Sequence, residues 1–292
     1  AASCTGMSEA TAIALRDKLT LEQLDLDLFR AQNEATLGNR LFGGQVLAQA
    51  LSAAQQTIEE RPCHSLHGYF LRPGKVDIPV IFQVERIRDG KSFSTRRIMG
   101  IQNGQAIFSM DASFQVKEAG LHHQMEPQPV PPPEALEDDR QVALRMTDLG
   151  PHAAWMTRER PFQIRSVAPI DQAPTAKTSQ AVWIRFSAPI LNTTTQQQLL
   201  AYASDMGLVS TAALPHRPNI PRDRLQMASL DHSLWFHDDL DLNDWLLYVK
   251  DTPVSHSNRG LNRGSFFDQE GRLVASVIQE GLMRVAPIPD QG

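Results

Sequence analysis

The sequence predicts an α+β fold built from two similar tandem units, each with one long buried helix wrapped by an antiparallel sheet. In each half of the chain, a charge-poor stretch of helical length leads into several β-strand segments separated by short turns. Two landmarks also recur 167 positions apart: residues 64–69 resemble residues 231–236, and Gln102-Asn103-Gly104 matches Gln269-Glu270-Gly271. Two such units can pair their edge strands and so cover each other's exposed edges.

The first half contains the more glycine-rich of the two helix entries. A modest helix candidate at residues 11–24 and a strand at residues 25–30 precede it. The charge-poor stretch 46–58 then predicts a buried helix, which the chain enters through the glycine pair at 43–44. Paired glycines allow close approach to the outward-pointing N–H groups of a helix start. The functional interpretation is an anion or carbonyl site, and the structural alternative is a tight turn. Strands follow at residues 64–71, 79–87, 92–102 and 105–115.

The second half repeats this pattern after a linker. Residues 116–154 are rich in proline and charge, with one short helix expected near residues 136–146. A second long helix is predicted over residues 195–213, with N-cap oxygens available from Asn192 and the threonines that follow it. Strands are predicted at residues 162–167, 181–186, 228–236, 245–250, 258–267 and 273–283.

Asp205 is the one formally charged residue between Arg185 and Arg217, and it falls within the second predicted helix. A carboxylate among apolar neighbours is costly unless it is hydrogen-bonded or faces a cleft. Asp205 is therefore either a capping group at a wet edge of the helix or a catalytic base whose pKa is tuned by burial.

The composition narrows the functional classes. The net charge is −5 and there is no basic cluster, which argues against a nucleic-acid partner. No apolar run approaches the roughly 18 residues of a membrane span. Two cysteines without an expected disulfide, and no visible signal peptide, favour a cytoplasmic location. Metal-ligand spacings such as HExxH or CxxC are missing, so no metal or other cofactor is expected.

Several motifs, taken together, resemble the acyl-CoA thioesterase II family. They are LFGGQ at 41–45, HSLH at 64–67, YFLRPG at 69–74, RDGKSF at 88–93, YASD at 202–205, LDHSLWFH at 230–237 and QEGLMR at 279–284. The resemblance extends from about residue 19 to residue 284. It implies a double hotdog, which is two helix-in-sheet units in one chain, and this agrees with the duplication.

The resemblance suggests a division of the chain. We expect an N-terminal segment at 1–18, whose first six residues (1–6) look like an expression-tag remnant, and a first hotdog unit at 19–118. A linker at 119–154 and a second, catalytic unit at 155–287 complete the expected division.

The resemblance also implies an activity, the hydrolysis of acyl-CoA to a free fatty acid and CoA. The family's catalytic Asp, hydroxyl and Gln fall on Asp205, Ser229 and Gln279, where Ser229 stands at a position that is often Thr. We expect these three groups to activate and orient a water that attacks the thioester directly. The oxyanion needs N–H donors, from Gly43–Gln45, from the turn before the second helix or from the Gln279 amide.

Substrate contacts are expected at Gly43, Gly44, Gln45 and His64, where His64 is either a substitute base or a structural histidine. Candidates for binding the CoA phosphates are Arg72, Lys91, Arg96, Arg97 and Arg263. We expect acyl-CoA as the partner and a homodimer or homotetramer as the assembly.

Two alternatives from other classes remain at this point. A hotdog enoyl-CoA hydratase or dehydratase typically has an Asp five positions before a His on the helix, whereas position 210 is Ser. A non-catalytic acyl-CoA-binding module would keep the fold and lose the polar groups, whereas all three are present. An α/β-hydrolase thioesterase would need a G-x-S-x-G elbow, which the sequence lacks.

Overall fold

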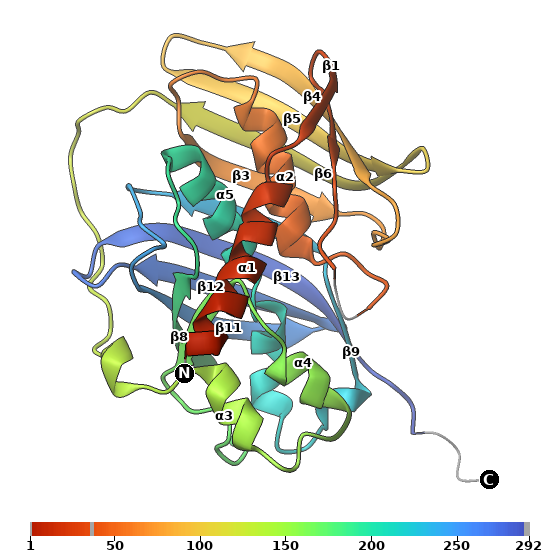
Figure 1. Ribbon diagram of the computed structural model, residues 1–292, viewed down its shortest axis with the longest axis vertical. Coiled ribbons are helices and arrows are strands. Elements are labelled where there is room, and N and C mark those ends of the chain that lie inside the picture. Colours follow the sequence, from red (N-terminus) through yellow and green to blue (C-terminus); the bar gives the residue numbers. More distant parts are fainter. Residues whose placement is uncertain (1, 36–37, 289–292) are drawn as a thin grey trace.

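The computed structural model describes residues 2–35 and 38–288, and its described strands form one continuous antiparallel sheet (Figure 1). The first half contributes β1 (Glu22–Asp25), β2 (Leu28–Ala31), β3 (Cys63–Phe70), β4 (Val80–Asp89), β5 (Phe93–Gln102) and β6 (Gln105–Gln115). The second half contributes β7 (Phe162–Ser166), β8 (Ser179–Phe186), β9 (Leu225–Ser229), β10 (Asp231–Phe236), β11 (Leu246–His256), β12 (Arg259–Phe267) and β13 (Leu273–Val285). These are the α+β composition and antiparallel strands that the sequence predicts.

The strand order is β1-β2-β4-β5-β6-β3-β10-β13-β12-β11-β8-β7, with β9 paired to β13. The two halves of this order mirror each other, because β3 and β10 take equivalent places on either side of the centre. Leu66 pairs with Leu234 across the junction, and both side chains are fully buried. The predicted edge pairing of the two units is thus confirmed. The matching triplets that start at His64 and His232 are 168 positions apart, one more than the spacing of the two turns.

The two central helices, α2 (Gly43–Gln55) and α5 (Thr193–Ser204), pack against each other in opposite directions. At one end, Gln55 near the end of α2 exchanges hydrogen bonds with Gln197 and Gln198 near the start of α5. At the other end, the ring of Phe42 before α2 meets the ring of Tyr202 at 4.9 Å, edge to face. The start of α2 therefore lies beside the end of α5.

Helix α5 is shorter than predicted, because it ends at Ser204 rather than at residue 213. Asp205 is its C-cap residue, and Gly207 has a φ of +65°, a left-handed conformation that stops an α-helix. The 3-10 helix η3 (Val209–His216) continues the chain. The predicted N-cap is confirmed, since the Asn192 side chain accepts a hydrogen bond from the Thr195 N–H at 2.8 Å.

Two strand predictions are corrected. Residues 25–30 are not one strand: Asp27 has a φ of +57°, and the chain turns there between β1 and β2. Residues 228–236 are also divided, because Leu230 separates β9 from β10. At this point the backbone N–H of Glu280 donates to the Asp231 carboxylate at 2.7 Å, so a side-chain oxygen is the acceptor instead of a main-chain carbonyl.

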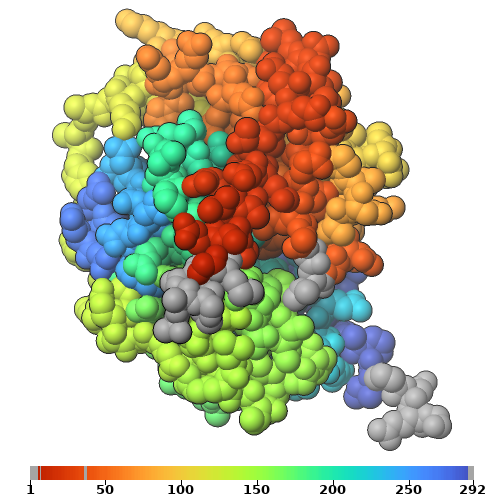
Figure 2. Space-filling view, viewed as in Figure 1, coloured from red at the N-terminus to blue at the C-terminus, as the bar shows by residue number. Residues whose placement is uncertain are grey.

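The N-terminal helix α1 (Ala2–Lys18) starts earlier than the predicted helix and ends before it. Figure 1 shows it crossing in front of α2 and α5, and Figure 2 shows it at the surface between the first unit and the green linker residues. Its apolar side chains Ala12 and Leu15 are fully buried in the main core. Because the first residues belong to this helix, the tag-remnant prediction for 1–6 falls partly on described backbone, while Ala1 lies outside the described residues.

The linker runs down the left edge of Figure 1 from β6 toward the second unit. It contains the 3-10 helices η1 (Pro133–Ala135) and η2 (Gly150–His152) and the helices α3 (Asp139–Arg145) and α4 (Ala153–Thr157). Helix α3 confirms the short helix predicted near residues 136–146. A further 3-10 helix, η4 (Arg222–Arg224), precedes β9.

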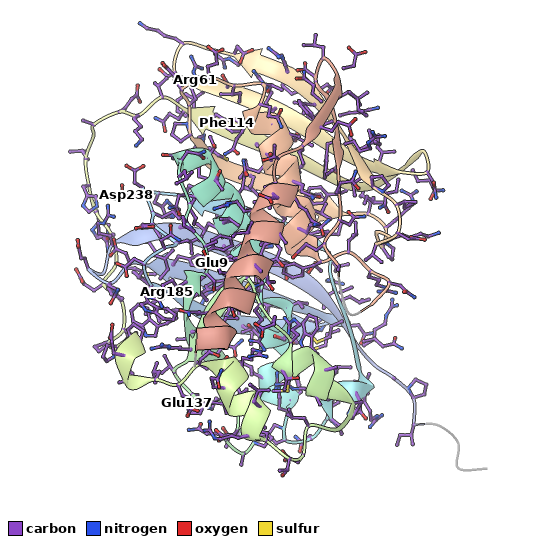
Figure 3. The ribbon with its side chains drawn as sticks, viewed as in Figure 1. Glu9, Arg61, Phe114, Glu137, Arg185 and Asp238 are labelled. Carbon is purple, nitrogen blue, oxygen red and sulfur yellow. The ribbon has the colours of Figure 1, made fainter. Side chains whose placement is uncertain are left out.

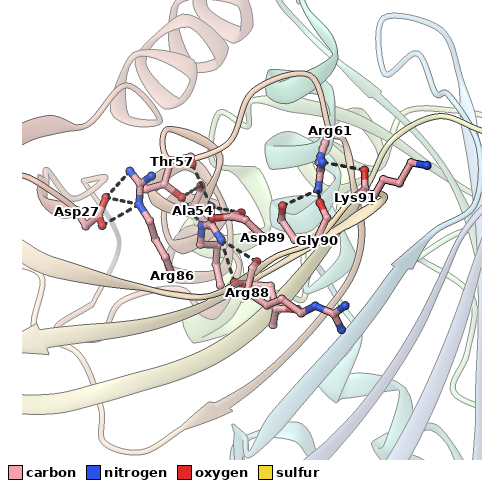
Figure 4. Close-up of polar contacts among 12 residues, drawn as sticks. Asp27, Ala54, Thr57, Arg61, Arg86, Arg88, Asp89, Gly90 and Lys91 are labelled. Carbon is pink, nitrogen blue, oxygen red and sulfur yellow. Dashed lines mark hydrogen bonds and ion pairs between the residues drawn. The ribbon is translucent and has the colours of Figure 1, made fainter.

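A buried arginine, Arg96, anchors the C-terminal end of α2. Arg61, which is labelled in Figures 3 and 4, marks this region of the molecule. Arg96 of β5 is 1% exposed, and its Nε donates to the Thr57 hydroxyl at 2.8 Å. Its second amino group donates to the Thr57 carbonyl at 3.2 Å and to Asp89 at 2.8 Å. The guanidinium thus satisfies the last carbonyls after α2 and ties the helix to the sheet.

Candidate active site

Asp205 lies at the end of α5 and is buried, with 6% of its surface exposed. Its Oδ1 accepts a hydrogen bond from Gln279 Nε2 at 2.7 Å. Burial raises the pKa of Asp205 from 3.8 to about 6, against the hydrogen bonds from the Gln279 side chain, the Gly44 backbone N–H and the Ser229 hydroxyl, which lower it. The carboxylate is therefore able to hold and release a proton near neutral pH.

The glycine pair at the start of α2 makes room for this carboxylate. A Cβ on Gly43 would lie 2.7 Å from Asp205 Oδ2, and a Cβ on Gly44 would lie 2.5 Å from the Tyr202 carbonyl oxygen. Any larger residue would force the two helix ends apart. The close approach predicted for the glycines is present, and the group that approaches is the Asp205 carboxylate of the other unit. The N-terminal end of α2 carries partial positive charge, which favours the ionised carboxylate.

Gln279 and Ser229 reach Asp205 from neighbouring strands. Gln279 is fully buried on β13. Ser229 ends β9, where it pairs with Gly281, two residues beyond Gln279. The structure thus brings together the three residues that the sequence analysis selected, across 74 positions between Asp205 and Gln279.

A fourth residue, His232, lies within the motif at 230–237 but is not among the site residues predicted from the sequence. It is fully buried on β10, and its Nδ1 lies 2.8 Å from Gln279 Nε2 and 3.8 Å from Asp205 Oδ1. Its Nε2 lies 2.8 Å from the Ser204 hydroxyl. Burial lowers the pKa of His232 to about 3, so the imidazole is neutral. The available signal was its place in the alternating segment 231–236, on the same side as the buried Leu234.

A second overlooked residue is Asn262, a fully buried amide on β12 that pairs with Gln279 in the β12–β13 ladder. Neither polar atom of its side chain has a hydrogen-bond partner among the described residues, and the same holds for Gln279 Oε1. Buried amide atoms without partners are costly, so these atoms are expected to bind a water or a substrate atom. An isolated asparagine in a strand gave no sequence signal.

Other predicted residues lie outside this cluster. The Gln45 side chain is held by Asn33 at 3.0 Å and by the Glu34 N–H at 2.8 Å, so it fixes the segment before α2. His64 is half-buried. Its Nε2 lies 2.6 Å from the Ser113 hydroxyl, and its ring lies against the ring of Phe93. It is four residues along β3 from Gly68, the residue that pairs with His232. The structure therefore does not bring His64 to Asp205.

The basic candidates for CoA phosphates are mostly engaged. Arg96 is buried, Arg97 pairs with Asp111 at 2.9 Å, and Arg263 pairs with Asp251 at 2.7 Å. Within residues 2–35 and 38–288, no three His, Cys, Asp or Glu side chains gather as metal ligands. Across the same ranges, no helix is long and apolar enough to cross a membrane.

Comparison with known proteins gives consistent matches over both units. The profile of the acyl-CoA thioesterase family matches residues 155–282, and that of the acyl-CoA thioesterase N-terminal domain matches residues 31–115. Acyl-CoA thioesterase 2 of Haemophilus influenzae is 37% identical, covering 91% of this chain and 95% of the relative. Human acyl-coenzyme A thioesterase 8 is also 37% identical, covering 92% of this chain and 88% of the relative.

Solved structures agree with these matches. An acyl-CoA thioesterase II from Mycobacterium marinum superposes with a TM-score of 0.78 at 38% identity, covering 93% of this chain and 98% of that chain. A hot dog fold protein from Alicyclobacillus acidocaldarius shares the fold, with a TM-score of 0.74 at 21% identity, covering 94% of this chain and 99% of that chain. With its two matched profiles and its mirrored sheet, the chain belongs to the acyl-CoA thioesterase II family and has the double hotdog fold.

Proposed function

We propose that this protein hydrolyses acyl-CoA thioesters by direct attack of a water, with Asp205 as the general base. The observation that carries the mechanism is the buried Asp205 carboxylate, with a pKa of about 6, in contact with Gln279, Ser229 and the start of α2. A base is most useful when its pKa lies close to the working pH, and burial provides this value.

The attacking water has a defined set of partners. Gln279 Nε2 already donates to Asp205, so the buried Gln279 Oε1 is the amide atom left to accept a hydrogen bond from that water. The other O–H of the water points to Asp205, which takes its proton during the attack. The Ser229 hydroxyl, which donates to the carboxylate, keeps that carboxylate in place.

The oxyanion is assigned to the start of α2. The turn before α5 lies at the opposite end of the helix pair, beside Gln55, which favours the start of α2 over it. The Gln279 amide is engaged by Asp205, and the Gln45 N–H donates to the Phe42 carbonyl at 3.0 Å. Gly44 donates to Asp205 itself, which leaves the Gly43 N–H as the leading donor. A preorganised donor of this kind contributes about 3 kcal/mol.

The chemistry balances without a covalent intermediate. The water oxygen bonds to the thioester carbon while Asp205 accepts the water proton. The carbon–sulfur bond then breaks, and the proton leaves with the CoA sulfur as a thiol. Detection by mass spectrometry of an acyl group on Ser229 or Asp205 during turnover would contradict this scheme.

Replacement of the base tests the proposal. Asp205→Asn keeps the shape of the side chain and removes its ability to accept a proton, so kcat should fall about 10²- to 10⁴-fold. The measurement is free-thiol release from acyl-CoAs of several chain lengths, with thermal unfolding as the check on folding. Near-wild-type hydrolysis by a folded Asp205→Asn protein would exclude Asp205 as the base.

The rival activities lack support at this site. A hydratase needs a histidine where Ser210 stands, and the Ser210 hydroxyl instead donates to the Gly207 carbonyl at 3.1 Å. The polar groups that a binding module would lack are all clustered here.

Three further expectations stay predictions. They are a cytoplasmic location, a homodimeric or homotetrameric assembly, and the unit boundaries at 19–118 and 155–287. Light scattering on the purified protein tests the assembly.

A further inference from the structure

A directed chain of hydrogen bonds runs from α5 through His232 to Gln279. The Ser204 hydroxyl donates to the Ala201 carbonyl at 2.7 Å and lies 2.8 Å from His232 Nε2. On the other side of the ring, His232 Nδ1 lies 2.8 Å from Gln279 Nε2. The three side chains of this chain of hydrogen bonds, those of Ser204, His232 and Gln279, are fully buried.

The two ends of this chain identify the same tautomer independently. A hydroxyl carries one proton, and Ser204 uses it on Ala201, so Ser204 must accept a hydrogen bond from His232 Nε2–H. At the other end, the Asp205 carboxylate can only accept, so the Gln279 atom that faces it is the donor Nε2, and His232 Nδ1 must accept from that same nitrogen. Both ends place the imidazole proton on Nε2.

This tautomer fixes the orientation of the Gln279 amide. One amide hydrogen goes to His232 Nδ1 and the other to Asp205 Oδ1. A rotated amide would direct its oxygen at both an ionised carboxylate and an unprotonated ring nitrogen, which is repulsive on both sides. In the observed orientation the Gln279 oxygen is free to accept, and the side-chain amide of Asn262, at the paired position of β12, also has no partner among the described residues.

We propose that His232 is a positioning residue that holds the Gln279 amide as a double donor, so that its oxygen faces the attacking water. This inference rests on the proposed function, because it deals with the same site. It also extends that site to Ser204, whose hydroxyl fixes the tautomer, and to Asn262, the cross-strand partner of Gln279, whose buried amide is available to the attacking water.

Several other titratable groups lie around Asp205, and their pKa values decide which group a pH profile reports. Burial raises the pKa of the Tyr202 and Tyr248 phenols well above their usual range, so both are neutral. Lys250 of β11 donates to the Met206 and Gly207 carbonyls, and burial lowers its pKa to about 8. Among these described groups, Asp205 itself is the one whose pKa lies near 6.

The first experiment observes the tautomer directly. The full chain is labelled with ¹⁵N-histidine, and the signal of His232 is assigned among the 9 histidines by its absence from His232→Asn. At pH 7 we expect a neutral ring with its proton on Nε2. A ring protonated on Nδ1, or a charged ring, would overturn the proposal without any reference to catalysis.

The second experiment removes the far end of the chain. In Ser204→Ala the ring proton loses its acceptor, the Gln279 amide loses its fixed orientation, and Asp205 loses part of its hydrogen bonding. We expect kcat to fall about 10-fold and the rising limb of the pH–kcat/KM profile to move up by about one unit, the size expected for one hydrogen bond to a charged group. A loss of thermal stability with an unmoved pH profile would show a structural role alone and contradict the proposal.

A matched control is present in the same sheet. His237 Nε2 and the Ser276 hydroxyl form a histidine–serine contact of 2.8 Å on exposed side chains outside the cluster. Ser276→Ala removes a contact of equal length and should leave the pH profile unchanged. At position 232, His232→Asn keeps an acceptor near the place of Nδ1 and should keep the limb near pH 6, whereas His232→Leu should raise it. Equal profiles for these two variants would count against the proposal.

The two proposals fail in different ways. If Asp205→Asn keeps full hydrolysis, the proposed mechanism fails whichever nitrogen of His232 carries the proton. If Asp205→Asn is inactive while the His232 proton sits on Nδ1, the mechanism stands and the positioning role of His232 fails.

Discussion

Asp205 carries opposing demands at the scale of the single residue. Its carboxylate is nearly removed from water, which raises its pKa from 3.8 to about 6, while three hydrogen-bond donors favour the ionised form. At neutral pH the group is therefore ionised but held at some energetic cost to the fold. Such a balance is typical of catalytic groups, whose environment is arranged for reactivity rather than for stability.

This cost predicts a dependence of stability on pH. Because the folded-state pKa is raised, Asp205 stabilises the fold most when protonated, below the unfolded pKa of 3.8, and that contribution is lost as the pH rises through about 6. Asp205→Asn resembles the protonated acid. Its free energy of unfolding relative to wild type should therefore increase between pH 4 and pH 7, by up to about 3 kcal/mol. Urea unfolding at several pH values measures this difference, and a difference that is constant with pH would contradict the raised pKa.

The hydroxyl of Ser229 predicts a pair of contrasting variants. Ser229 donates to Asp205 and lowers its pKa, so Ser229→Ala should raise the rising limb of the pH profile and reduce kcat about 10- to 100-fold. Ser229→Thr keeps the hydroxyl and should retain activity close to wild type. Steady-state kinetics from pH 5 to pH 8 separates the two, and equal activity of both variants would remove Ser229 from the site.

At the scale of the element, the site is made by two helix ends that face each other. Helix α5 brings Asp205 to its C-terminal end, an unfavourable place for a negative charge, and the start of α2 compensates with N–H groups and partial positive charge. The antiparallel packing of α2 and α5 is thus part of the catalytic arrangement, since neither helix alone supplies both groups.

The close packing of these helix ends predicts a strong effect at Gly43. The methyl group of Gly43→Ala would lie 2.7 Å from Asp205 Oδ2 and 3.0 Å from the Phe70 ring, so the carboxylate must move. We expect kcat to fall at least about 10-fold, because the base is displaced from its position, and thermal unfolding checks that the variant is folded. Gly120→Ala is the control, since nothing lies within 4 Å of its added methyl group. Wild-type kinetics of Gly43→Ala would show that Asp205 tolerates displacement.

At the scale of the whole molecule, the two units share one sheet but differ in their polar groups. Leu66 faces Ala112 in the β3–β6 ladder of the first unit, and Ala112 lies 167 positions before Gln279. The C-cap of α2 is Gln56, at the position that Asp205 occupies after α5. The first unit therefore has neither the acid nor the amide at the matching positions, and its matching histidine, His64, contacts the Ser113 hydroxyl instead. The first unit contributes the glycine pair to the site of the second unit.

This asymmetry predicts one substrate site per chain. A non-hydrolysable thioether analogue of acyl-CoA should bind with a stoichiometry of one per chain by isothermal titration calorimetry. Asp205→Asn should keep that stoichiometry, because it alters the base and not the number of units. Two equivalents per chain would mean that the mirrored position at the end of α2 also binds substrate.

The sequence by itself determined the repeated helix-and-strand pattern, the edge pairing of the units and the isolation of Asp205, because each depends on periodicity or charge along the chain. The family resemblance added Ser229 and Gln279. The sequence pattern did not predict the early end of α5 at Ser204, which depends on the left-handed conformation of Gly207. It also did not predict the division of residues 228–236 at Leu230.

Only the tertiary structure decided what surrounds the carboxylate. The approach of Gly43 to Asp205, the contact of His232 with Gln279 and the pairing of Asn262 with Gln279 join segments that are far apart in sequence. Such contacts follow from the β3–β10 and β12–β13 registers and from the opposed directions of α2 and α5. The pattern within a segment fixes which face of that segment is buried, whereas the residue that meets it there is fixed only when the two units pack together.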